Sequence, residues 1–65
     1  MNFVVHKFQV GEKVTVKAWW TVPKGQPVLC VIEAQSKPLP EPYYDVRPAA
    51  NPGAHVRFVN EKEII

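Results

Sequence analysis

The sequence predicts a single all-β domain of five short strands with one helical turn before the last strand. Seven prolines between residues 23 and 52 exclude helices from most of the chain. Several of the segments around them alternate between apolar and polar side chains, which is the pattern of half-buried strands. With 65 residues, 46% of them hydrophobic, the chain has the size and composition of one soluble domain.

The first predicted strand covers residues 13–19, after a turn that Gly11 favours. Its alternation places one set of side chains inside (Val14, Val16 and Ala18) and the other set outside (Lys13, Thr15, Lys17 and Trp19). Residues 28–34 are the most apolar segment and predict the central strand. Residues 36–42 contain three prolines and predict a loop of partly polyproline conformation.

The second half of the chain repeats the strand pattern. Residues 43–47 place Tyr44 and Val46 on one face. Residues 55–59 predict a fourth strand with Val56 and Phe58 inward and His55 outward. Residues 60–63 suit one helical turn capped by Asn60, after which residues 64–65 form the fifth strand. We expect residues 1–65 to form one domain, with residues 1–6 frayed by default.

This order of features resembles the SH3-like small barrel. The resemblance is carried by Phe-x-Val-Gly-Glu-x-Val at residues 8–14, Tyr-x-Val at 44–46, the strand at 55–59 and Glu-x-Glu-Ile at 61–64. It covers nearly the whole chain and implies a five-stranded SH3-like barrel. Barrels of this kind bind peptides, methylated side chains or bases through aromatic residues near their loops.

A second resemblance, over residues 11–58, is to the type II, plasmid-borne dihydrofolate reductases. It is carried by Gly-Glu-Lys-Val at 11–14, Gly-Gln-x-Val at 25–28, Pro-Glu at 40–41, Tyr-x-Val at 44–46 and Pro-Gly-Ala at 52–54. The resemblance implies an SH3-like homotetramer around one shared active-site pore. In that family a Val-Gln-Ile-Tyr segment stacks the cofactor and the pterin, whereas this chain has Val56 in place of the glutamine, followed by Arg57 and Phe58. We therefore expect the fold and a tendency to oligomerise, but not the activity.

We expect no catalytic residue, no cofactor and no metal site. His6 and His55 are the only histidines and have no acidic residue at a metal-ligand spacing. Ser36 lies in the proline-rich loop, and each of the three glycines is isolated. Cys30, the single cysteine, lies in the apolar run 28–32 and is expected to be a small core residue. The sequence therefore predicts a protein that is not an enzyme.

Charge and hydropathy limit the partners. Eight Lys and Arg against six Asp and Glu give a net charge of +2, with the cations spread along the chain, which argues against a dedicated phosphate binder. The longest apolar run, residues 28–32, is too short to span a membrane. The first residues lack the features of a signal peptide. We expect a cytoplasmic protein with no membrane partner.

The aromatic residues are the most informative candidates for a site. They occur as the pairs Trp19-Trp20 and Tyr43-Tyr44, and one member of each pair in a strand must point outward. Exposed Trp and Tyr are enriched at protein interfaces. We therefore predict a partner-binding site of Trp19, Trp20, Tyr43, His55 and Arg57. The alternative is a structural role, in which Trp20 fills the barrel mouth and the tyrosines cover its edge.

Three hypotheses for the function follow. The first is a small non-catalytic SH3-like binding module that contacts a protein partner or a second copy of itself through exposed aromatic loop residues. Its small size also favours self-association. The second is a nucleic-acid-binding barrel of the KOW or Tudor-like kind, using Lys13, Lys17, Lys24 and Arg57 with Trp19 and Tyr43 as stacking platforms. The third is an oligomeric enzyme similar to the type II reductases.

Overall fold

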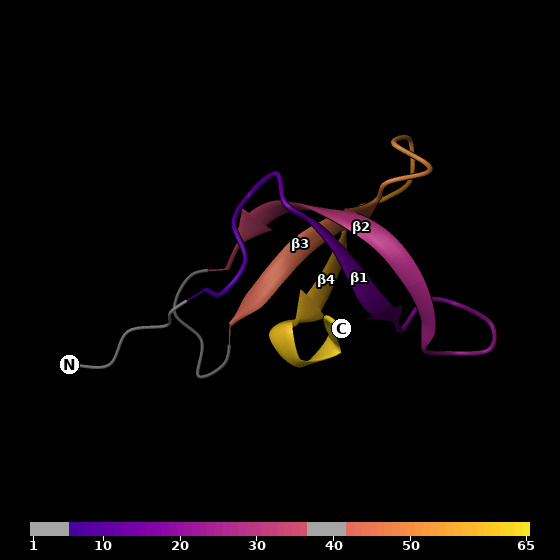
Figure 1. Ribbon diagram of the computed structural model, residues 1–65. Helices are drawn as coiled ribbons and strands as arrows, with labels where there is room; N and C mark the ends of the chain where they lie inside the picture. Colours follow the sequence, from indigo (N-terminus) through magenta and orange to yellow (C-terminus); the bar gives the residue numbers. More distant parts are fainter. Residues whose placement is uncertain (1–5, 37–41) are drawn as a thin grey trace.

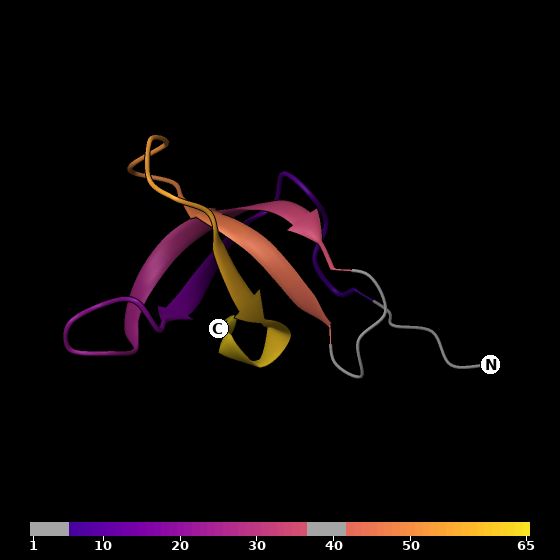
Figure 2. The same cartoon turned by 180° about the vertical axis from the view of Figure 1, so that it is seen from behind.

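The computed structural model describes residues 6–36 and 42–65, and these form an all-β unit, as predicted. Its elements are β1 (Lys13–Ala18), β2 (Gln26–Gln35), β3 (Tyr43–Pro48), β4 (Arg57–Asn60) and the 3-10 turn η1 (Glu61–Glu63). The four strands pair antiparallel in the order β1-β2-β3-β4. Figures 1 and 2 show the sheet curled into a half-barrel, with η1 beneath its arch.

Two sequence predictions fall partly outside the described residues. The expected polyproline loop covers residues 36–42, of which 37–41 are not described. The expected frayed terminus covers residues 1–6, of which only His6 is described. Within the described ranges, no helix combines the length and apolar character needed to cross a membrane.

The concave side of the sheet carries the core. The register pairs Val14 with Cys30 and Ile32 with Val46, so inward side chains of neighbouring strands meet. The buried cluster consists of Val14, Val16, Cys30, Ile32, Tyr44, Val46 and Val59. The inward phases predicted for the first and third strands are confirmed, and so is the burial of Cys30.

The predicted fifth strand is not shown. In the described part of the chain, residues 64–65 contribute one isolated antiparallel bridge between Ile64 and Val16. The backbone N–H of Ile65 also donates a hydrogen bond to the Thr15 carbonyl at 2.8 Å. These contacts attach the C-terminal residues to the free edge of β1 without extending into a ladder.

The predicted helical turn is confirmed as η1. The Asn60 side chain accepts a hydrogen bond from the Lys62 backbone N–H, and the Glu63 carboxylate accepts one from the Asn60 backbone N–H. This reciprocal capping box satisfies backbone donors that a helix start leaves without an intrahelical partner. The cap fixes the direction in which the chain leaves β4.

The predicted phase of the fourth strand is wrong. Val56 and Phe58 were expected inward, but both are exposed, whereas Val59 is completely buried. β4 begins at Arg57, so alternation places Arg57 and Val59 on the concave side and Phe58 on the convex side. The physical reason is the register, which pairs Val59 with the buried Tyr44, while Phe58 stacks on Tyr43 on the other face of the sheet.

Tyr44 closes one end of the half-barrel. Its side chain is completely buried, and its hydroxyl donates a hydrogen bond of 2.5 Å to Glu61 Oε2 of η1. The same hydroxyl accepts a hydrogen bond from the Phe8 backbone N–H at 3.2 Å. The rings of His6 and Phe8 pack edge-on against the Tyr44 ring. One phenol therefore joins β3, η1 and the segment that precedes β1.

Burial raises the pKa of the Tyr44 phenol above its ordinary value, and the hydrogen bond to Glu61 raises it further. The folded protein thus holds the phenolic proton more tightly than the unfolded chain, in which tyrosine titrates near pH 10. This contribution to stability is complete below about pH 10 and is lost as the pH rises through the folded-state pKa.

We predict that Tyr44→Phe lowers the free energy of unfolding by about 1–2 kcal/mol at neutral pH, because the Phe8 N–H loses its acceptor and Glu61 keeps only the Lys7 N–H of its two donors at Oε2. We expect the difference between the wild type and Tyr44→Phe to narrow as the pH rises past about 10. Urea unfolding from about pH 8 to about pH 11 measures this. Parallel stability curves for the two proteins would contradict the assignment.

A second prediction tests the register of β2. Ile32→Ala is expected to cost about 2–5 kcal/mol of unfolding free energy, because it opens a cavity in the buried cluster. Leu29→Ala, on the opposite face of the same strand and half-exposed, is expected to cost about 1 kcal/mol or less. Chemical denaturation of both variants decides the matter, and similar losses at the two positions would show that the faces are assigned wrongly.

Candidate binding surface

Of the five predicted partner-binding residues, the structure brings the side chains of Trp19, Trp20 and Arg57 into direct contact. His55 joins them through its backbone carbonyl, and Tyr43 joins them only through Phe58. Trp19 and Trp20 follow β1, Tyr43 opens β3, His55 precedes β4, and Arg57 is the first residue of β4. Phe58, which the sequence analysis did not include, completes this run of contacts. We call Trp19, Trp20, Tyr43, His55, Arg57 and Phe58 together the aromatic ridge.

The contacts of the aromatic ridge begin at His55, whose backbone carbonyl accepts a hydrogen bond from Arg57 Nη1 at 3.1 Å. The Arg57 guanidinium lies over Trp20, which meets Trp19 edge-to-face with ring centroids 5.5 Å apart. The edge-to-face ring pair and the cation–π contact both have the geometry that the electrostatics of aromatic rings favours. They hold the two indoles at fixed positions.

Phe58 carries the run onto the convex face. Its ring stacks on Tyr43 with centroids 4.6 Å apart and an angle of 10° between the planes. The register places Phe58 opposite Asp45 and Tyr43 opposite Asn60, so the two rings are diagonal neighbours on one face of the sheet. Trp19 and Phe58 are 45% and 49% exposed, whereas Trp20 is partly buried and packs against the core.

The indole of Trp19 also caps a strand edge. In an antiparallel pair, only alternate residues exchange backbone hydrogen bonds with the partner strand. The Glu61 N–H donates to the Pro42 carbonyl, so the register makes Val59 and Arg57 the bonded residues and leaves Phe58 between them. The backbone groups of Phe58 therefore point away from β3. Trp19 Nε1 donates a hydrogen bond of 3.1 Å to the Phe58 carbonyl. A side chain thus occupies a position at which a further strand would pair.

The loop that presents the indoles, residues 19–25, is held at its base. The Gly25 N–H donates to the Ala18 carbonyl at 2.9 Å, and the Gln26 N–H donates to Thr21 Oγ1 at 3.0 Å. Gly25 has a φ of +92°, a conformation that other residues adopt only with strain. The loop therefore leaves β1 and re-enters β2 through a defined turn.

Arg47 holds the second loop at this end of the half-barrel, residues 49–56. It forms a two-pronged ion pair with Glu33, with Nε 2.8 Å from Oε2 and Nη2 3.0 Å from Oε1. Its Nη1 donates to the carbonyls of Pro52 and Ala54. The hydrogen bond from Arg47 lowers the pKa of the Glu33 carboxyl, and the same contact raises the pKa of Arg47. Arg47 therefore fixes the loop that leads to His55 by bonding two of its carbonyls.

The side chains expected to be inert in catalysis have structural contacts. Cys30 is buried, and this burial raises the pKa of its thiol. Ser36 Oγ accepts a hydrogen bond from the Tyr43 N–H, and Thr21 Oγ1 takes part in the loop described above. Among the residues that the structure describes, no three His, Cys, Asp or Glu side chains come together in a group that would hold a metal ion.

Sequence reasoning missed Phe58 and the Tyr44–Glu61 pair. Two apolar residues, Val56 and Phe58, supported the wrong phase of β4, and the single signal for the correct phase was Val59. Tyr44 and Glu61 are 17 positions apart, and no spacing rule joins them. Comparison of the chain with protein-family models, curated proteins and solved structures finds no match.

Proposed function

We propose that the protein is a small non-catalytic SH3-like module that binds a macromolecular partner through the aromatic ridge. The observation that carries this proposal is the continuous contact run from His55 to Tyr43, in which two large rings remain about half-exposed although they are fixed by neighbours. Rigid, exposed aromatic side chains supply binding energy at a low cost in conformational entropy.

The SH3-like part of the proposal is supported by the topology. A curled antiparallel four-stranded sheet is followed by a 3-10 turn, and the next residues bridge back to β1. A fifth strand at residues 64–65 would complete the barrel along the edge of β1 that Ile64 and Ile65 already contact. The non-catalytic part is supported by the buried Cys30 and by the engaged oxygens of Ser36 and Thr21.

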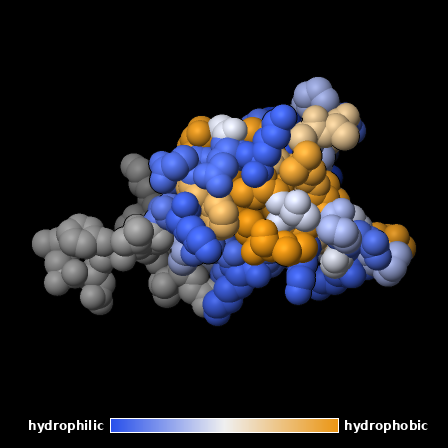
Figure 3. Space-filling view, viewed as in Figure 1, coloured by the Kyte–Doolittle hydropathy of each residue, from blue (hydrophilic) through white to orange (hydrophobic). Residues whose placement is uncertain are grey.

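The exposed apolar side chains outside the aromatic ridge favour self-association of the chain through a second surface. Val22 and Ile65 are among the exposed large hydrophobic residues outside the ridge. Figure 3 shows apolar side chains gathered where β1, β2 and the C-terminal residues lie. Light scattering over a wide range of protein concentration tests self-association. A monomeric mass at every concentration would leave a foreign molecule as the partner, whereas a stable tetramer would favour the reductase-like alternative.

We predict that the folded protein binds 1-anilinonaphthalene-8-sulfonate, a probe with aromatic rings and one negative charge, at the aromatic ridge. Phe58→Ala is expected to weaken this binding about fivefold to tenfold, because the probe loses a half-exposed apolar surface. Leu29→Ala removes a side chain of matched exposure elsewhere and is expected to leave the affinity unchanged. Fluorescence titration of the three proteins measures the difference.

If the probe binds Phe58→Ala and Leu29→Ala as tightly as it binds the wild type, the binding surface lies elsewhere and the proposal is wrong. Far-UV circular dichroism of each variant serves as the control for folding. The Phe58 side chain lies on the convex face and outside the buried cluster, so we expect Phe58→Ala to remain folded.

A further inference from the structure

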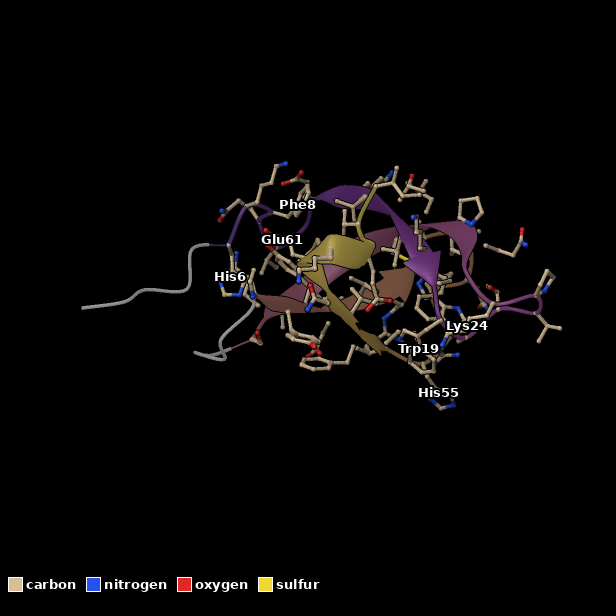
Figure 4. All side chains as sticks on the ribbon, turned by 90° about the horizontal axis from the view of Figure 1, so that it is seen from below. His6, Phe8, Trp19, Lys24, His55 and Glu61 are labelled. Carbon is tan, nitrogen blue, oxygen red and sulfur yellow. The ribbon has the colours of Figure 1, made fainter. Side chains whose placement is uncertain are left out.

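The end of the half-barrel that presents the indoles is basic. The loops at this end, residues 19–25 and 49–56, contain Lys24 and His55 and no Asp or Glu. Figure 4 shows Trp19, Lys24 and His55 at this end and His6, Phe8 and Glu61 at the other. Lys17 shares the outward phase with Trp19 two positions later. Although the net charge of the chain is only +2, its charged side chains are therefore unevenly distributed over the fold.

Acidic side chains lie mainly away from this end. Glu61 is bonded to Tyr44 at the opposite end, and Glu63 belongs to the η1 cap. Two acidic residues are exceptions: Glu33, whose partner Arg47 also bonds the 49–56 loop, and Asp45, which the register places opposite Phe58 on the convex face. A carboxylate at the Asp45 position repels phosphate but accepts a hydrogen bond from an amino group of a base. We therefore expect phosphates to lie toward Lys17 and Lys24.

The ridge is unsuited to a cationic ligand. An aromatic cage for a methylated amine uses open ring faces, but the Arg57 guanidinium already lies over Trp20 at 5.4 Å. Lys17 and Lys24 add positive charge at the same end. Electrostatic complementarity thus favours an anion.

The ridge is also unsuited to a peptide that binds by adding a strand. Such a peptide pairs with free backbone groups of an edge strand. Here the Phe58 carbonyl accepts the Trp19 indole N–H, and the Thr15 carbonyl accepts the Ile65 N–H. The features that remain for recognition are ring faces and positive charge.

Resting on the proposed function, we infer that the partner of the aromatic ridge is a single-stranded nucleic acid. Its bases stack on the exposed rings of Trp19 and Phe58, with Phe58 extending the stack that it forms with Tyr43. Its phosphates contact Lys17 and Lys24. Aromatic platforms beside cations are the general means by which proteins hold single strands without reading their sequence.

The test is fluorescence anisotropy with a labelled, unstructured single-stranded DNA oligonucleotide of mixed sequence, titrated at several salt concentrations. We expect Phe58→Ala to weaken binding about fivefold or more, because a stacked base loses its platform. We expect Lys24→Gln to reduce the slope of log K against log salt by about 0.7, because one phosphate contact is lost.

Two matched controls accompany these variants. Lys13→Gln makes the same charge change at the start of β1, roughly 17 Å along the strand from Ala18, and should leave the salt slope unchanged. Leu29→Ala removes a side chain as exposed as Phe58 and should leave the affinity unchanged. Equal effects of Lys24→Gln and Lys13→Gln, or no effect of Phe58→Ala, would show charge-driven association without stacking and overturn the inference.

An acidic peptide rich in Glu and Tyr, of the same length as the oligonucleotide, serves as a second ligand. It distinguishes a failure of the nucleic-acid inference from a failure of the proposed function. If the peptide binds and loses affinity in Phe58→Ala while the oligonucleotide does not bind, the nucleic-acid assignment is wrong and the binding module stands. If neither binds and the anilinonaphthalene probe also fails to report the ridge, the proposed function itself is wrong. Absence of oligonucleotide binding overturns the inference in either case.

Discussion

The curled sheet has to be closed between β1 and β4 by contacts other than a continuous strand ladder, and the rest of the structure depends on these contacts. At one end the buried Tyr44 hydroxyl joins Glu61 and the Phe8 backbone. In the middle, Ile64 forms a single bridge to Val16. At the other end, the Trp19 indole donates to the Phe58 carbonyl. Each contact is local, so the two ends of the half-barrel are free to differ in chemistry.

This difference links closure to the candidate function. The Tyr44 end is buried and relies on a phenol whose proton is held by burial and a carboxylate. The Trp19 end uses the indole N–H for closure and leaves the ring about half-exposed. Because the indole position is already fixed by Phe58 and Trp20, a ligand that stacks on it loses little side-chain entropy.

Local patterns were sufficient for the elements whose signals lie within a few residues. The alternation around Val14 and Val46 predicts their burial, and Asn60 with Glu63 carries the signature of a capping box. The phase of β4 was not predictable, because apolar residues occur in both phases and the long-range pairing of Val59 with the buried Tyr44 distinguishes them. The basic end was also not predictable from the sequence. The net charge of +2 sums over the whole chain, whereas the fold places Lys24 and Glu61 at opposite ends (Figure 4).

The most direct test of the central claim, that the Trp19 end is a preformed binding surface, is a two-dimensional proton–nitrogen NMR titration with the single-stranded oligonucleotide. We expect shift changes at the Trp19 indole N–H and at backbone amides of residues 19–25 and of β4, with the amides around Tyr44 and Glu61 unchanged. Changes centred on the Tyr44 end, or spread evenly over every lysine-bearing segment, would contradict this claim.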